Sequence, residues 1–211
     1  MTATKPSEPA DVTTTGHEHP ARADGAALVI IDMQRDLVCD DLGELLPWAG
    51  DAVVAAAGAV DWAHRHDVPV IWVRVQRRAD YADAPSARTD LSARRAGGAR
   101  RLVAGTVGAD LAPGLEPHAG DFDLVKPRVN AFFGTNLGAL LHRLGVDRIL
   151  VGGVWTHMGV EATVRGSYDR DIDAVVLTDA CAAASRALHE HSVTAILPSI
   201  AVTITTAELP Q

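Results

Sequence analysis

The sequence predicts an α/β fold in which parallel strands alternate with helices in a single domain. Short apolar runs recur along the chain, and most are continuous rather than alternating, as in residues 26–32 (AALVIID). Continuous apolar runs are typical of strands buried on both faces, as in a parallel sheet covered by helices. Longer stretches with helical periodicity separate these runs, which indicates repeated strand–helix–strand units. With 211 residues, 47% of them hydrophobic, the chain can bury one substantial core.

The predicted elements follow one another in a regular order. Strands are expected at 26–32, 68–75, 121–125, 147–153, 172–178 and 199–204. Helices are expected at about 44–66, 135–144, 157–170 and 185–196. The second helix has the clearest pattern, with leucines at i, i+3, i+4 and i+7 followed by a glycine that can end it: Leu137, Leu140, Leu141, Leu144 and Gly145.

Two segments do not fit this pattern. Residues 1–24 are rich in threonine, proline and charge, so they are predicted to be a disordered tail, and 25–211 to be the domain. The tail contains His17-Glu18-His19, which is interpreted as a solvated run rather than a metal site. The segment from Gln76 to about Gly120 is charged and has little periodicity, and it is expected to wall one side of a pocket.

Composition excludes several classes of partner. The net charge is −8 and no run of Lys and Arg exceeds two residues, which disfavours nucleic acid and anionic membranes. Apolar stretches are far shorter than the roughly 18 residues that span a bilayer, and the N-terminus lacks an apolar signal core. Cys39 and Cys181 are far apart and show no metal-ligand spacing, so both are predicted to be structural thiols in a reducing cytoplasm.

Polar residues follow the predicted strands where ligands bind parallel α/β sheets, beyond the carboxyl ends. Asp32 closes the first strand, Gln76 follows the second and Lys126 follows the third. The segment 154–159 follows the fourth. No GxGxxG follows the first strand and no GxxxxGK[ST] occurs, so nucleotide chemistry is disfavoured and no cofactor is expected. The sequence therefore predicts a small-molecule site at this edge of the sheet.

Three separated blocks carry a family resemblance: VIIDMQRD (29–36), KPRVNAFFGTNL (126–137) and GGVWTHMGVEATVRGSYDRDI (152–172), followed by VVLTDACA (175–182). With this order and spacing the chain, from residue 26 to 208, resembles the isochorismatase-like superfamily. The resemblance implies a three-layer α/β/α fold with a six-stranded parallel sheet in the order 3-2-1-4-5-6. It also implies assembly as a homodimer or homotetramer.

Amide-cleaving members of this superfamily use an aspartate, a lysine and a nucleophilic cysteine. By resemblance, Asp32 and Lys126 match the first two, and the cysteine position falls on Gly159. Glycine has no side chain that can attack a carbonyl, so the usual acyl-enzyme chemistry is not expected. The His-containing metal motif that nicotinamidases carry after the second strand is replaced here by Gln76-Arg77-Arg78, and no metal is predicted.

True isochorismatases resemble this chain where the cysteine is missing. Their frame of an aromatic, a histidine and a glycine is matched by Trp155, His157 and Gly159. The resemblance therefore implies cleavage of a vinyl ether with Asp32 as general acid, which requires a carboxyl kept protonated in a dry pocket. Lys126 would lower the pKa of that carboxyl, so sequence leaves the balance open.

The resemblance also implies the groups that surround the substrate. Substrate-binding roles are expected for Gln76, Trp155, His157, Met158 and Phe133. The backbone N–H groups of Met158 and Gly159 are expected to face a substrate carboxylate at a helix start. A cis peptide is expected between Val154 and Trp155.

Other features leave the substrate open. GTNL (134–137) and the run at 178–182 resemble amidohydrolases, and Asn130 replaces a small serine. Arg77, Arg78 and Arg88 are candidates for a carboxylate clamp or for ordinary surface positions, and Arg128 is interpreted as structural. Three hypotheses remain: a vinyl- or enol-ether hydrolase, a thiol-independent hydrolase or lyase on an amide or cyclic substrate, and a pseudoenzyme that serves as a binding module.

Overall fold

The computed structural model describes residue 21, residues 23–86, residue 89 and residues 100–211. The predicted tail lies outside these residues except for Ala21, Ala23 and Asp24, as do His17-Glu18-His19 and Arg88. Ala21 is fully buried against the core that begins with the first strand. In the part of the chain that is described, no helix is long and apolar enough to cross a membrane.

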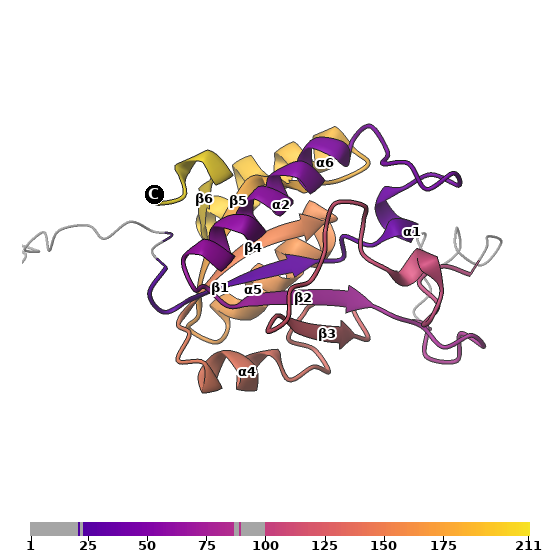
Figure 1. Ribbon diagram of the computed structural model, residues 1–211, viewed down its shortest axis with the longest axis horizontal. Helices are drawn as coiled ribbons and strands as arrows, with labels where there is room; N and C mark the ends of the chain where they lie inside the picture. The colour runs from indigo at the N-terminus through magenta and orange to yellow at the C-terminus, as the bar shows by residue number, and fades with distance from the viewer. Residues whose placement is uncertain (1–20, 22, 87–88, 90–99) are drawn as a thin grey trace, which may run out of the picture.

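The structure is built around one six-stranded parallel sheet (Figure 1). Its order is β3-β2-β1-β4-β5-β6, which confirms the predicted topology. The strands are β1 (Ala26–Ile31), β2 (Val70–Val75), β3 (Phe122–Lys126), β4 (Arg148–Val154), β5 (Asp173–Ala182) and β6 (Val202–Ile204). β1 and β2 lie inside the sheet, and their apolar runs are buried almost throughout. The edge strand β3 alternates between exposed and less exposed residues instead.

Helices cover both faces of this sheet (Figure 1). The α-helices are α1 (Arg35–Val38), α2 (Gly50–Arg65), α4 (Leu137–Arg143), α5 (Glu161–Tyr168) and α6 (Arg186–His191). Short helical turns are η1 (Val107–Ala109), η2 (Thr156–Val160), η3 (Ser192–Ile196), η4 (Leu197–Ser199) and η5 (Thr206–Glu208). Helix α2 packs on one face through a row of alanines and valines, while α4 and α5 pack on the other. Two apolar cores therefore hold the sheet between layers of helices.

Several predicted bounds differ from the structure for local reasons. The helix expected from residue 44 begins at Gly50, because the Leu46 N–H is committed to Val38 O at 2.8 Å. The helix expected at 157–170 starts as a wider π-helical turn, η2, before α5 continues it. β5 continues to Ala182 rather than ending at 178, and its pairing with β4 shifts register between Val151 and Gly153. The short helix α1 was not predicted.

Residues 111–118 cross from the strand ends back over the α2 side of the sheet. Leu111 bridges to Gln34, and Ala112 N donates to Met33 O at 2.9 Å. Farther along, Gly114, Leu115, Glu116 and His118 line a cavity of about 150 Å³ together with α2 and Trp72. None of the predicted site residues lines this cavity, so the expectation that the segment after β2 walls one side of the substrate pocket stays a prediction.

Candidate active site

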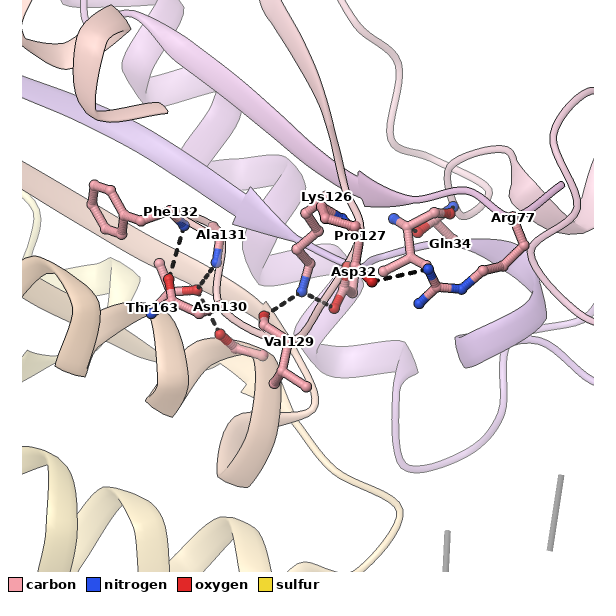
Figure 2. Close-up of polar contacts among 12 residues, drawn as sticks. Asp32, Gln34, Arg77, Lys126, Pro127, Val129, Asn130, Ala131, Phe132 and Thr163 are labelled. Atoms are coloured by element: carbon pink, nitrogen blue, oxygen red, sulfur yellow. Dashed lines mark hydrogen bonds and ion pairs between the residues drawn. The ribbon is translucent and has the colours of Figure 1, made fainter. Parts of the chain in front are cut away.

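The carboxyl ends of the inner strands bring the two predicted catalytic side chains into contact. Asp32 follows β1, and Lys126 is the last residue of β3, two strands away in the sheet. Lys126 Nζ donates to Asp32 Oδ2 at 2.7 Å (Figure 2). Lys126 is fully buried and Asp32 is 7% exposed. A buried ion pair of this kind is a poor source of stability, so its presence at the ligand-binding edge indicates chemistry.

Asp32 has an unusual backbone conformation. Its φ is +56°, in the left-handed region where aspartate and asparagine are the side chains best tolerated after glycine. Its N–H donates to Val73 O on β2, and its carbonyl accepts from Gln34 N, both at 2.8 Å. These bonds turn the chain sharply at the strand end and aim the carboxyl toward Lys126.

The ammonium of Lys126 is held from a second direction. Besides Asp32, Nζ donates to the backbone carbonyl of Val129 at 2.6 Å. Val129 belongs to the loop that follows β3, so the lysine side chain folds back over its own loop (Figure 2). The position of the charge therefore depends on the position of that loop.

Burial has the largest effect on the pKa of the Asp32 carboxyl. Desolvation raises the pKa of the Asp32 carboxyl above its usual value, against the lowering effects of Lys126 and, more weakly, Arg77. Its Oδ1 atom is buried and, within the described ranges, has no hydrogen-bond partner. Sequence alone did not determine whether burial or Lys126 has the larger effect on this pKa. In the structure the effect of burial is larger, so the carboxyl holds its proton more tightly than a free aspartate does.

Gly159 lies in η2, directly beside this carboxyl. A Cβ on residue 159 would lie 3.0 Å from Asp32 Oδ2 and 3.2 Å from both Ile31 Cγ2 and Val154 O. These distances are tighter than ordinary van der Waals contact, so the neighbours would have to move to admit any side chain. Gly159, which occupies the position predicted for the cysteine, is therefore packed closely against Asp32.

The other predicted residues of this segment surround the same turn. The Val154–Trp155 peptide is cis, as predicted. The rings of Trp155 and His157 are nearly parallel, with centroids 6.3 Å apart. Trp155 Nε1 and His157 Nδ1 are buried, and no partner for them is found among the described residues. Burial lowers the pKa of His157, with Glu161 opposing, so its imidazole is neutral near pH 7.

One expectation about this turn is wrong. The Met158 N–H is not a free anion donor, because it already donates to Trp155 O at 2.8 Å. This bond reaches back three residues to Trp155, the residue that caps the N-terminus of η2. Met158 itself is half-buried at this turn.

Two predicted substrate contacts are placed differently from the rest. Phe133 is 59% exposed, whereas its neighbour Phe132 is the aromatic ring that packs inward. Gln76 is half-buried, and the glutamine locked at the strand ends is Gln34, which is fully buried. Gln34 pairs with Val75 N and O, each at 2.8 Å, and also donates to Ala109 O at 2.8 Å. The position of Gln34, two residues after Asp32, was the sequence signal that could have identified it as part of the site.

Two further residues are buried and make contacts that the sequence pattern did not predict. Arg77, which could equally have been a surface arginine, is 8% exposed and donates from Nη1 to Pro127 O at 2.9 Å. Thr163 is fully buried in α5 and bonds to two separate segments. Arg78, in contrast, is exposed and pairs with Asp80, and Arg128 bonds to the carbonyls of Asp83 and Pro127.

Neither cysteine replaces the missing thiol. Burial raises the pKa of the Cys181 thiol to about 12 and also raises that of Cys39. A raised pKa disfavours the reactive thiolate. In the described ranges, no three His, Cys, Asp or Glu side chains are grouped so that they could hold a metal ion.

Comparison with known proteins places the chain among relatives of similar size. The isochorismatase domain model matches residues 26–208. The uncharacterized isochorismatase family protein YwoC of Bacillus subtilis is 34% identical over 183 residues, covering 86% of this chain and 90% of YwoC. A probable inactive nicotinamidase of Arabidopsis thaliana is 32% identical over 166 residues, covering 77% of this chain and 83% of the plant protein. The crystal structure of an isochorismatase family protein from Desulfovibrio vulgaris superposes with a TM-score of 0.78 at 34% identity, covering 88% of this chain and 96% of the other.

Proposed function

This chain belongs to the isochorismatase family, and on that premise we propose that it hydrolyses a vinyl or enol ether such as isochorismate by Asp32 general-acid catalysis. The observation that carries the proposal is the buried Asp32 carboxyl beside Gly159. Burial raises its pKa, one of its oxygens has no partner in the described part of the chain, and no thiol is adjacent to it. A neutral carboxyl in a dry site is the form in which aspartate can donate a proton.

The reaction needs one proton delivered to carbon. Asp32 transfers its proton to the methylene carbon of the enolpyruvyl group, and the C–C double bond supplies the electron pair for the new C–H bond. The oxocarbenium ion that results is captured by water, which gives up a proton to the Asp32 carboxylate and so forms a hemiketal. Collapse of the hemiketal breaks the ether C–O bond and yields pyruvate and a diol. No covalent enzyme intermediate is involved.

The two carboxyl oxygens of Asp32 have different roles in this mechanism. Oδ2 accepts from Lys126 Nζ at 2.7 Å, so the transferable proton resides on Oδ1. After the transfer, the ammonium of Lys126 stabilises the carboxylate, which in turn stabilises the adjacent oxocarbenium ion. Gly159 packs directly beside the same carboxyl, where a side chain would press on Oδ2.

The function is tested with isochorismate and a panel of small amides and ureides. We expect pyruvate release from isochorismate, and the rate should be unchanged within about twofold in a Cys39→Ser/Cys181→Ala variant, because both thiols are buried and protonated. Amide turnover in place of pyruvate release would favour a thiol-independent amidohydrolase. Binding without turnover of any substrate would favour a pseudoenzyme.

The pH dependence provides a second test of the acid. Asp32 acts in its protonated form, and its pKa is raised above 3.8. The value of kcat/KM for pyruvate release should therefore be highest at low pH and fall by about tenfold per pH unit above the folded-state pKa of Asp32. A pH–rate profile measured over the range in which the protein stays folded checks this. A rate that rises with pH would mean that Asp32 acts as a base.

A further inference from the structure

Three hydrogen bonds fix the loop after β3, and all three affect the position of the Lys126 ammonium. Pro127 O accepts from Arg77 Nη1 at 2.9 Å, and Val129 O accepts from Lys126 Nζ at 2.6 Å. At the far end, Ala131 N donates to the hydroxyl of Thr163 at 3.0 Å (Figure 2). The middle anchor is the contact that places the ammonium, so the two outer anchors determine where that contact forms.

Thr163 joins this loop to the other half of the site. Its Oγ1 accepts from Ala131 N and donates to Gly159 O at 2.7 Å. The second bond, from a threonine to the carbonyl four residues earlier, is common in helices. The first bond spans 32 residues of sequence and has no role in the helix. One fully buried hydroxyl thus connects the lysine loop with the turn that packs against Asp32.

Neighbouring contacts keep the loop in place along α5. The Asn130 side chain accepts from Phe132 N at 2.8 Å, and it lies so close to Gly166 that a Cβ there would overlap its amide. The guanidinium of Arg170 stacks over the Phe132 ring at 4.7 Å. The loop therefore packs on one surface of the helix, and Thr163 supplies the polar bond nearest to Gly159.

We infer that Thr163 is a positioning residue whose hydroxyl couples the 127–131 loop to the Gly159 turn and so holds Lys126 Nζ against Asp32. The inference extends the proposed function, because it assigns a role at the same site to a residue that touches no substrate. Without the hydroxyl, the Ala131 N–H is left buried and unpaired, and the loop must shift to satisfy it. A shift of about 1 Å can cost about 10²-fold in rate when a catalytic group moves with it.

Two pairs of variants isolate the hydroxyl. Thr163→Val keeps the shape of threonine and removes the hydroxyl, while Thr163→Ser and Thr163→Ala differ from each other only by the hydroxyl. Ser167→Ala is the matched control, because Ser167 is fully buried in the same helix and donates only within it, to Val164 O at 2.8 Å. If the valine variant does not fold, the comparison of the serine and alanine variants still tests the role of the hydroxyl.

Two measurements are made on the full chain. The first is a carbon-detected NMR titration of the Asp32 carboxyl, which needs no substrate. We expect its midpoint to rise by at least about half a pH unit in Thr163→Val and Thr163→Ala, because contact with Lys126 lowers that pKa and becomes less populated. The second is pyruvate release, for which kcat should fall at least about tenfold with KM changed less than twofold. Thr163→Ser and Ser167→Ala should match the wild type in both measurements.

The outcomes separate this inference from the proposed function. An Asp32 midpoint that stays unchanged or falls in Thr163→Val and Thr163→Ala overturns the positioning role, whatever the wild type does with isochorismate. A midpoint that rises equally in Ser167→Ala also overturns it, since general loosening of α5 would then be the cause. A wild type that releases no pyruvate contradicts the proposed function alone, because the titration still tests the link between Thr163 and Asp32.

Discussion

Asp32→Asn should reduce the rate of pyruvate release from isochorismate by about 10³-fold or more. The amide has the shape of the carboxyl, but it cannot deliver a proton to carbon, and general-acid catalysis contributes about 10²- to 10⁴-fold. Asparagine also adopts a φ of +56° as readily as aspartate does, so the turn after β1 is retained. The loss should appear in kcat, measured by coupling pyruvate formation to its reduction.

The matched control for this substitution is Asp41→Asn, which makes the same chemical change at an exposed position nine residues along the chain. It should retain full activity. The asparagine variant at 32 should have a circular dichroism spectrum like that of the wild type, which separates a catalytic defect from misfolding. Pyruvate release by Asp32→Asn at the wild-type rate would exclude Asp32 as the proton donor.

Lys126→Met should impair both catalysis and stability. Methionine fills the space of the fully buried aliphatic chain but removes the charge that faces Asp32 Oδ2 and Val129 O. Loss of electrostatic stabilisation of this kind costs about 10²- to 10³-fold in kcat. Removing one member of a buried ion pair also destabilises a fold by about 3 to 5 kcal/mol when the remaining group is charged.

The stability loss in Lys126→Met should depend on pH. Without the ammonium, the folded-state pKa of Asp32 rises further above its unfolded value. A raised pKa contributes stability at low pH that is lost as pH rises through the folded-state value. Urea unfolding should therefore show a small deficit in acid and a larger one at neutral pH. Arg78→Met, at an exposed ion pair, should show neither effect, and a Lys126→Met deficit independent of pH would contradict the coupling to Asp32.

The architecture followed largely from local pattern, because most strands carry their own evidence of burial. Short apolar runs predicted all six strands within a few residues, and the sheet order came from the family resemblance. The main errors lie where tertiary contacts decide an element's length. The extension of β5 to Ala182 lies beside the glycine pair of β4, where Gly153 pairs with Cys181 and a Cβ on Gly152 would lie 3.1 Å from the Ala180 carbonyl oxygen.

For the site, the sequence by itself placed Asp32 and Lys126 at the same edge of the sheet, and the family resemblance placed Gly159 at the position of the thiol. Only the tertiary structure decided the rest. Whether Asp32 holds its proton depends on how completely the fold excludes water, and burial exceeds the opposing charges. That Gln34 rather than Gln76 is locked in place, that Arg77 is buried, and that Thr163 reaches Ala131 are contacts between segments far apart in the chain. Such contacts depend on how distant segments pack together, and this packing leaves no local pattern in the sequence.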